Sequence, residues 1–211
     1  MFLISTISIL SGVTQFLGYA IYTKDTIFGK IRPNTASWSI WAFGAVLESL
    51  SYIFLTGDIL KNVHPIVCAI SAVLFFLLCL KRGHFEKITR FESVIVIADI
   101  TIIIIWFLTQ SPFYANLLFI FTAIVSFVPI IIHVYKNPLY EKAFPWFIWT
   151  SAYALQTFVV IARFEKAEDL MYPLVFFVLH LIVAILAIDS RKKRHLATLS
   201  KLSRKPHPEH L

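Results

Sequence analysis

Residues 38–53 read WSIWAFGAVLESLSYI, and residues 146–161, which lie 108 positions later, read WFIWTSAYALQTFVVI. Both segments open on two tryptophans at the same spacing, and the same offset also pairs Pro65 with Pro173. Trp and Pro are rarer than Leu or Ile, so membrane composition alone does not readily explain these matches. The sequence therefore predicts two copies of one unit. Small membrane proteins built from such repeats are mostly transporters.

The composition predicts a membrane protein. Of the 211 residues, 58% are hydrophobic and 15% are charged, which is too apolar for a soluble domain of this size. Seven apolar stretches approach or exceed the roughly 20 residues that cross a bilayer. They cover residues 2–22, 36–56, 63–80, 93–109, 113–135, 144–162 and 170–188. We therefore expect an all-α membrane protein with seven transmembrane helices, with no room for a soluble catalytic domain. The first span has no Lys or Arg before Lys24, which favours a retained helix over a cleaved signal peptide.

The basic residues predict the orientation. With seven spans, 16 of the 19 Lys and Arg residues fall on the side that also carries the C-terminal tail, and three fall on the other side. Basic loops remain cytoplasmic, so we expect the N-terminus outside and the C-terminus in the cytoplasm, in the plasma (inner) membrane. The three residues on the outer side are Lys61, Arg163 and Lys166.

The repeat divides the chain into four parts. Residues 1–82 form a first three-helix repeat, and residues 113–190 form the second. Residues 83–112 contain a linker helix without a counterpart, and residues 191–211 form a basic cytoplasmic tail. Because the extra crossing restores the direction of the chain, we expect two parallel repeats related by an axis along the membrane normal.

The first helix of each repeat contains a residue that weakens a helix. Matching Phe16 with Phe127 sets Gly18 opposite Pro129. Glycine lacks a Cβ, and proline removes a backbone donor. A bend at the same place in both halves would suit a rocking transporter, so Gly18 and Pro129 are candidate hinges. The alternative is that both residues are simply common in membrane helices.

This plan resembles the SWEET/PQ-loop transporters. The closest stretch is VPIIIHVYKNPLYEKAFPWFIW at residues 128–149, and residues 18–41 are similar but looser. The Pro-Gln dipeptide of the family is absent, because Ile130 follows Pro129. The resemblance implies two three-helix units around a linker helix, and alternating access for a sugar-like or other small polar metabolite. The nicotinamide riboside carriers have a related plan with Trp-rich helices and are the second possibility.

A charged group at the centre of a bilayer costs about 2.5–3.5 kcal/mol on insertion scales, so ionisable residues in mid-span are functional candidates. Glu48 lies two helical turns after Trp41, so both project from one face. The second repeat places Trp149 and Gln156 in the same relation. We expect these four residues to bind a polar solute with a flat or sugar-like face. The alternative for Glu48 is a hydrogen bond to a neighbouring helix.

The resemblance implies further site residues. The third helix of each repeat contributes polar groups to the central cavity in SWEET-like proteins, which here leaves His180 and Ser71. The linker helix normally stands outside the transport core, so Asp99 is assigned to structural pairing. Trp38 and Trp146 begin their spans beside the basic loops and are expected in the interfacial belt.

Several classes of site are not expected. No lysine lies in residues 170–188 to hold retinal, and the histidine spacing suits neither haem nor a metal. The six glycines never cluster into a phosphate loop. We therefore expect no cofactor, no metal, no catalytic residue and no enzymatic activity. Cys68 and Cys79 share one span without disulfide or metal spacing and are expected to pack as small apolar residues.

The net charge of +7 is concentrated beside the membrane. The basic run at residues 191–194 directly follows the last span, so we expect contact with anionic lipids at the cytoplasmic face rather than with nucleic acid. The other expected partner is a small-molecule solute, and a homo-oligomer is left open. Two functions remain: a transporter, or a non-transporting receptor or scaffold on the same fold.

Overall fold

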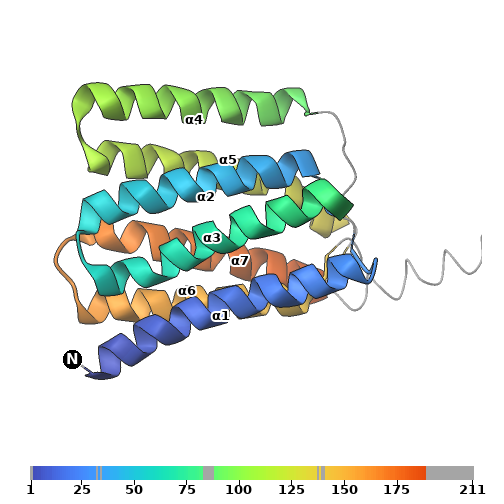
Figure 1. Ribbon diagram of the computed structural model, residues 1–211, viewed down its shortest axis with the longest axis horizontal. Coiled ribbons are helices and arrows are strands. Elements are labelled where there is room, and N and C mark those ends of the chain that lie inside the picture. The colour runs from blue at the N-terminus through green and yellow to red at the C-terminus, as the bar shows by residue number, and fades with distance from the viewer. Residues whose placement is uncertain are drawn as a thin grey trace, which may run out of the picture.

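The computed structural model describes residues 2–31, 33, 35–82, 88–136, 138 and 141–188. These residues form seven α-helices and one short 3₁₀ helix (Figure 1). The elements are α1 (Phe2–Ile27), α2 (Thr35–Thr56), α3 (Ile59–Arg82), α4 (Arg90–Thr109), α5 (Pro112–Lys136), α6 (Ala143–Ala162), η1 (Ala167–Leu170) and α7 (Met171–Ile188).

All seven α-helices are long and apolar enough to cross a membrane, which confirms the number and approximate position of the predicted spans. The main difference is α1, which continues to Ile27 rather than ending at Tyr22. Backbone hydrogen bonds continue beyond the end of α1, where Lys30 N donates to Asp25 O at 2.8 Å. Hydropathy missed this last turn because it contains charged side chains.

Six helices form a ring, in the order α1, α3, α2, α5, α7, α6 and back to α1. The seventh, α4, lies outside this ring against α5 and α2, and Figure 1 shows it at the edge of the bundle opposite α1. Only Ile95, Asp99 and Ile102 of α4 are buried. The ring helices therefore enclose the interior, and α4 covers the junction between α2 and α5.

The burial pattern fits a protein surrounded by lipid. Large apolar side chains cover the outside, including Phe107, which is 76% exposed, and Phe54, which is 65% exposed. Polar side chains such as Ser11, Gln15 and Glu48 are buried instead. Polar groups are costly in hydrocarbon and face the interior of helix bundles. The chain is an integral membrane protein.

The bundle has two ends, which we name after one residue each. At the Lys61 end, α2, α4 and α6 finish and α3, α5 and α7 begin; at the Glu141 end, α1, α3 and α5 finish and α2, α4 and α6 begin. Most described Lys and Arg residues lie at the Glu141 end. The basic tail at residues 191–211, Arg32 and Lys87 fall outside the described residues.

Candidate functional site

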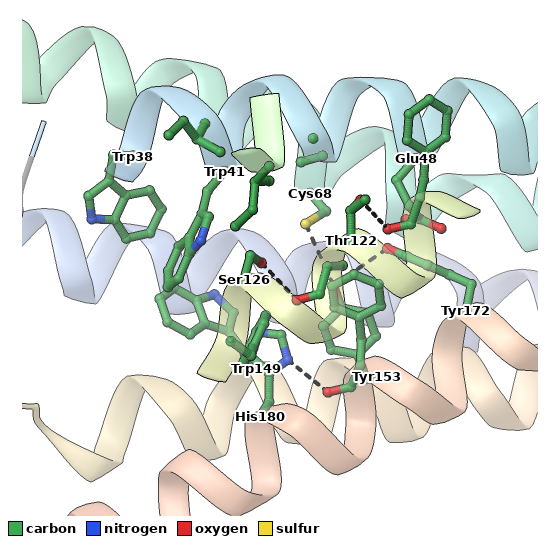
Figure 2. A pocket seen from close by; sticks show the side chains of 18 of the residues that line it. Trp38, Trp41, Glu48, Cys68, Thr122, Ser126, Trp149, Tyr153, Tyr172 and His180 are labelled. Carbon is green, nitrogen blue, oxygen red and sulfur yellow. Dashed lines mark hydrogen bonds between the residues drawn. The ribbon is translucent and has the colours of Figure 1, made fainter. Parts of the chain in front are cut away.

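A cavity lies inside the ring and reaches α4 (Figure 2). Its volume is about 90 Å³, which would hold about six to nine water molecules at 10–15 Å³ each. Figure 2 shows Trp38 and Trp41 toward one end of the cavity and Glu48 and Tyr172 toward the other. The cavity is therefore elongated along the helices and suits a small solute.

Helical periodicity explains how α2 and α6 line the cavity. On α2, Trp41, Ala45 and Glu48 recur at intervals of four and three residues and share one face. On α6, Trp149 and Tyr153 form a similar stripe. Each stripe turns large aromatic rings inward.

The other ring helices add narrower stripes. Phe119, Thr122, Ala123, Ser126 and Phe127 line the cavity from α5. The remaining contributors are Gln15 and Tyr19 from α1, Cys68 from α3, and Tyr172, Phe176 and His180 from α7. The wall is thus mostly aromatic, with a few polar groups at defined places.

Aromatic contacts hold the wall together. Trp41 stacks on Phe127 with ring centroids 5.7 Å apart and planes at 12°, while Tyr153 stacks on Phe176 at 5.4 Å and 14°. His180 lies beside Tyr153, with centroids 4.8 Å apart. Such offset and edge-on pairs contribute about 0.5–1.5 kcal/mol beyond area burial. The rings are therefore fixed by each other as well as by their helices.

Four of the predicted site residues line this one cavity: Trp41, Glu48, Trp149 and His180. They come from α2, α6 and α7, so residues far apart in the sequence are brought together. Their role in binding a solute stays a prediction.

Gln156 and Ser71 do not line the cavity. Gln156 is fully buried closer to the Lys61 end, where its Nε2 donates to the Lys61 carbonyl at 2.5 Å. Its amide is thus directed at α3, unlike the carboxyl of Glu48. Ser71 is buried on α3, the helix that reaches the cavity with Cys68 instead. Neither residue is part of the lining of this cavity, and a role for either in binding a solute stays a prediction.

Trp38 and Trp146 are not interfacial, which corrects the prediction of an aromatic belt. Both line the cavity, and they are 6% and 1% exposed. The Trp146 indole Nε1 donates to Glu141 Oε2 at 3.1 Å. This inward hydrogen bond supplies the partner that a belt tryptophan would find in the headgroup region.

Asp99 is a cavity residue that the sequence assigned to structural pairing. It is 2% exposed, lines the cavity from α4, and accepts a 2.8 Å bond at Oδ1 from Thr122 Oγ1. Asp99 therefore lines the cavity and also makes a structural hydrogen bond, which joins α4 to α5 at the cavity wall. The sequence contained the same signal for a site residue at Asp99 as at Glu48, because both are acidic residues in the middle of a span.

The two candidate hinges have different surroundings. Pro129 lies inside α5, which continues to Lys136. Gly18 faces Trp149, and a Cβ added there would lie 2.3 Å from the indole Nε1 and 2.5 Å from Cδ1. Gly18 therefore lets the α6 indole approach the α1 backbone, which is a packing reason for glycine. A hinge role for either residue stays a prediction.

We expect Gly18→Ala to destabilise the protein by about 1–3 kcal/mol, because the rigid indole of Trp149 must move to admit the new methyl group. The measurement is thermal unfolding in detergent. Gly44→Ala is the matched control, since its Cβ would make an ordinary 3.9 Å contact with Asp99 Oδ2. Equal melting temperatures for the two variants would contradict the close approach.

Glu48 lies in a polar network toward the Lys61 end of the cavity. Asn116 Nδ2 donates to Glu48 Oε1 and to Ser51 Oγ, both at 3.1 Å. This is the helix-to-helix bond that the alternative reading of Glu48 predicted. It coexists with a place in the cavity wall, because the network joins α2 to α5 beside the cavity.

Beyond that network, a buried ion pair lies at the Lys61 end. Lys61 Nζ is 2.6 Å from Asp169 Oδ2, and the two side chains are 0% and 1% exposed. Glu165 approaches the same amine at 3.4 Å. Tyr52, one turn beyond Glu48, donates to the Asp169 carbonyl at 2.7 Å. These contacts join α2, α3 and η1 at the Lys61 end of the bundle.

At the Glu141 end, a buried carboxyl joins α1 to α6. Glu141 is 6% exposed and accepts from Tyr22 Oη at 3.0 Å and from Trp146 Nε1 at 3.1 Å. Burial raises the pKa of Glu141 to about 7, although the bonds from Trp146, Tyr22 and the Lys142 backbone act in the opposite direction. Nearby, Asp25 pairs with Lys142 at 3.2 Å.

Among the described residues, no group of three or more His, Cys, Asp or Glu side chains is placed to hold a metal ion. Cys68 and Cys79 are buried and free. Cys68 does more than pack, because its Sγ accepts from Gln15 Nε2 at 3.1 Å in the cavity wall. The polar groups of the site are thus suited to hydrogen bonding and charge pairing.

Comparison with known proteins finds no matching family model, no significantly similar curated protein and no significantly similar solved structure. The function must therefore be inferred from the chemistry of the cavity and the arrangement of the helices.

Proposed function

We propose that this protein is a membrane transporter that moves a small polar solute by alternating access through the central cavity. The observation that carries the proposal is the burial of an ionisable side chain, Glu48, in an aromatic cavity shared by helices from both halves of the chain. Ionisable groups inside a bilayer are expensive and mark solute or ion pathways. Pockets with few polar groups among aromatic side chains are typical of small-molecule sites.

The order of the ring supports two units. Exchanging α1 with α5, α2 with α6 and α3 with α7 leaves the set of neighbouring helices in the ring unchanged. Lys61 and Asp169 are 108 positions apart, the offset of the sequence repeat, and they touch each other. Residues related by a two-fold axis can touch only near that axis. The proposed axis therefore passes close to this ion pair and runs along the bundle.

Polar contacts at the two ends of the bundle suit alternating access. One set is the ion pair between Lys61 of α3 and Asp169 of η1, and the other is the pair of bonds to Glu141 from α1 and α6. Each set consists of a few polar contacts, which can break and reform as the units rock. In the proposed cycle the two sets of contacts open in turn.

Uptake into liposomes tests this function. We expect liposomes containing the purified protein to take up a small polar solute, and Trp149→Ala to weaken its binding by about 1–3 kcal/mol if the ring stacks on the solute. Trp106→Ala is the matched control, because Trp106 lies on α4 outside the cavity lining. Binding without uptake of any solute would instead favour a receptor or scaffold.

We further propose that the N-terminus is outside and the Glu141 end is cytoplasmic, from the partition of basic residues. Cysteines introduced at Ile59 and Lys166 should react with a membrane-impermeant maleimide in intact cells, and a cysteine at Lys30 should react only after lysis. All three positions are exposed. The parent protein is the background control, because its two described cysteines are buried. The reverse labelling pattern would contradict this orientation and would place the N-terminus in the cytoplasm.

A further inference from the structure

The cavity contains acids without basic partners. Glu48 and Asp99 both line it, and none of the described residues in its lining is a lysine or an arginine. Lys61 lies at the same end as Glu48 but is paired with Asp169 at 2.6 Å. The lining contains one histidine, His180, beside the ring of Tyr153.

Both carboxyls have neutral partners. Asn116 contacts Oε1 of Glu48 at 3.1 Å, and Thr122 contacts Oδ1 of Asp99 at 2.8 Å. The two acids are 4% and 2% exposed. An ionised carboxylate in such surroundings is costly unless a cation joins it. The cavity therefore favours a positively charged occupant over a neutral or negative one.

The geometry leaves room beside these acids. Gly44 lies one turn before Glu48 on α2, and a Cβ added to it would lie 3.9 Å from Asp99 Oδ2. Because Gly44 has no side chain, the second oxygen of Asp99 borders open space in the cavity. Residues four apart share a helix face, so Glu48 borders the same part of it.

An additional acceptor is left unused. Gln15 lines the cavity and is 1% exposed, and its Oε1 has no hydrogen-bond partner within the described part of the chain. A buried polar atom without a partner is costly, so it favours a ligand that donates a hydrogen bond. The Ser126 hydroxyl already donates to the Ala123 carbonyl of α5, and the single hydroxyl proton of Thr122 is shared between Asp99 Oδ1 and the Phe119 carbonyl. Within the described part of the chain, the unused polar atoms of the wall are this acceptor and one donor, the indole Nε1 of Trp149, and the two carboxyls add further acceptors.

The aromatic wall adds a second attraction for cations. Rings of Trp41, Trp149 and Tyr153 line the cavity. The face of an aromatic ring is electronegative, and its attraction for a cation increases when water is excluded. Indole is the strongest of these ring systems. Anions would meet repulsion from both the acids and the ring faces.

We propose that the solute is a small organic cation, which is attracted by the carboxyls of Glu48 and Asp99 and by the ring faces of Trp41 and Trp149. This inference rests on the proposed function for its role in transport, and on the cavity alone for binding. The cavity volume of about 90 Å³ suits a small solute.

Ligand titration of the purified protein tests the charge preference. The probes are choline, tetramethylammonium and n-butylammonium, compared with 3,3-dimethylbutan-1-ol, which is the uncharged isostere of choline, and with butyrate and glucose. Four of the five tryptophans line the cavity, so their fluorescence reports binding. We expect at least one cation to bind saturably and its neutral or anionic match to bind at least about tenfold more weakly.

Variants locate the site. Glu48→Gln and Asp99→Asn should each weaken cation binding by about tenfold, because each removes one carboxylate from the cavity. Glu92→Gln is the matched control on α4, since Glu92 lies outside the lining and bonds to Ser37 and Thr89. If a variant fails to fold, the comparison of choline with its isostere in the parent protein still tests whether the cavity prefers a cation.

The outcomes separate the two proposals. Equal binding of choline and its isostere, preferential binding of butyrate or glucose, or no binding of any of the three cations would overturn the cation inference. Liposome uptake of a neutral solute would then leave transport intact. Cation binding without uptake would remove transport and keep the cation site.

Discussion

Lys61→Met should destabilise the protein by about 3–5 kcal/mol, because it leaves the Asp169 carboxylate buried without a counter-ion. Asp169 Oδ2 is 2.6 Å from the Lys61 amine, and its Oδ1 has no hydrogen-bond partner among the described residues. Tyr52 contacts only the main-chain carbonyl of Asp169 and offers no compensation. Thermal and denaturant unfolding in detergent would measure the loss.

Two further variants show whether the charge itself causes the loss. The double variant Lys61→Met/Asp169→Leu removes both charges and keeps apolar volume, so it should recover most of the stability. Arg163→Ala is the matched control at the same end, because Arg163 pairs with Asp58 but its side chain is 33% exposed. Exposed pairs contribute about 0–1 kcal/mol. A loss for Lys61→Met no larger than for Arg163→Ala would contradict the buried pair.

The Lys61–Asp169 pair is a contact that the sequence analysis did not predict, although the helices that carry it were predicted. Hydropathy and length are local properties, so they predicted all seven helices and most of their bounds. The stripe of Trp41 and Glu48 followed from helical periodicity for the same reason. Lys61 and Asp169 lie in loop-proximal segments whose contact depends on how two helix ends meet. Their separation of 108 was an unused clue, since it equals the offset of the repeat.

The depth and rotation of each helix could not be obtained from periodicity. Glu48 and Gln156 are 108 positions apart and would be equivalent in the predicted repeat, but Glu48 borders the cavity and Gln156 bonds to the Lys61 carbonyl. Trp38 and Trp146 start their helices beside basic loops, which is typical of belt residues, but helix packing turns both inward. Asp99 is expected outside the site because the resemblance implies a linker helix there, but it lines the cavity. In each case the outcome depends on contacts between helices, which one sequence does not contain.

Glu141 was also missed by the sequence, because a glutamate in a basic loop resembles a solvated residue. Its burial follows from the approach of α1 to α6, which places Tyr22 and Trp146 over the carboxyl. Among the described residues, Lys142 is adjacent to Glu141 in the chain, and it pairs with Asp25, which also pairs with Lys30. The loop therefore contains a carboxyl that is far less hydrated than its neighbours.

We expect the stability of the protein to decrease as the pH rises from about 5 to 8, by about 3 kcal/mol in total from Glu141. Burial raises the pKa of this carboxyl from 4.5 to about 7, so the folded protein holds the proton more tightly than the unfolded chain. The stabilisation is complete below the unfolded pKa and is lost as the pH rises through the folded value. Above that pH, the folded protein contains a buried carboxylate.

Melting temperatures at a series of pH values measure this dependence, and Glu141→Gln should flatten it because glutamine does not titrate. Tyr22→Phe provides a second test with a definite sign. It removes a hydrogen-bond donor that favours the ionised form, so it should move the midpoint to higher pH without abolishing the dependence. An unchanged pH profile in Glu141→Gln would assign the effect to another group. A downward shift in Tyr22→Phe would mean that the tyrosine bond does not stabilise the carboxylate.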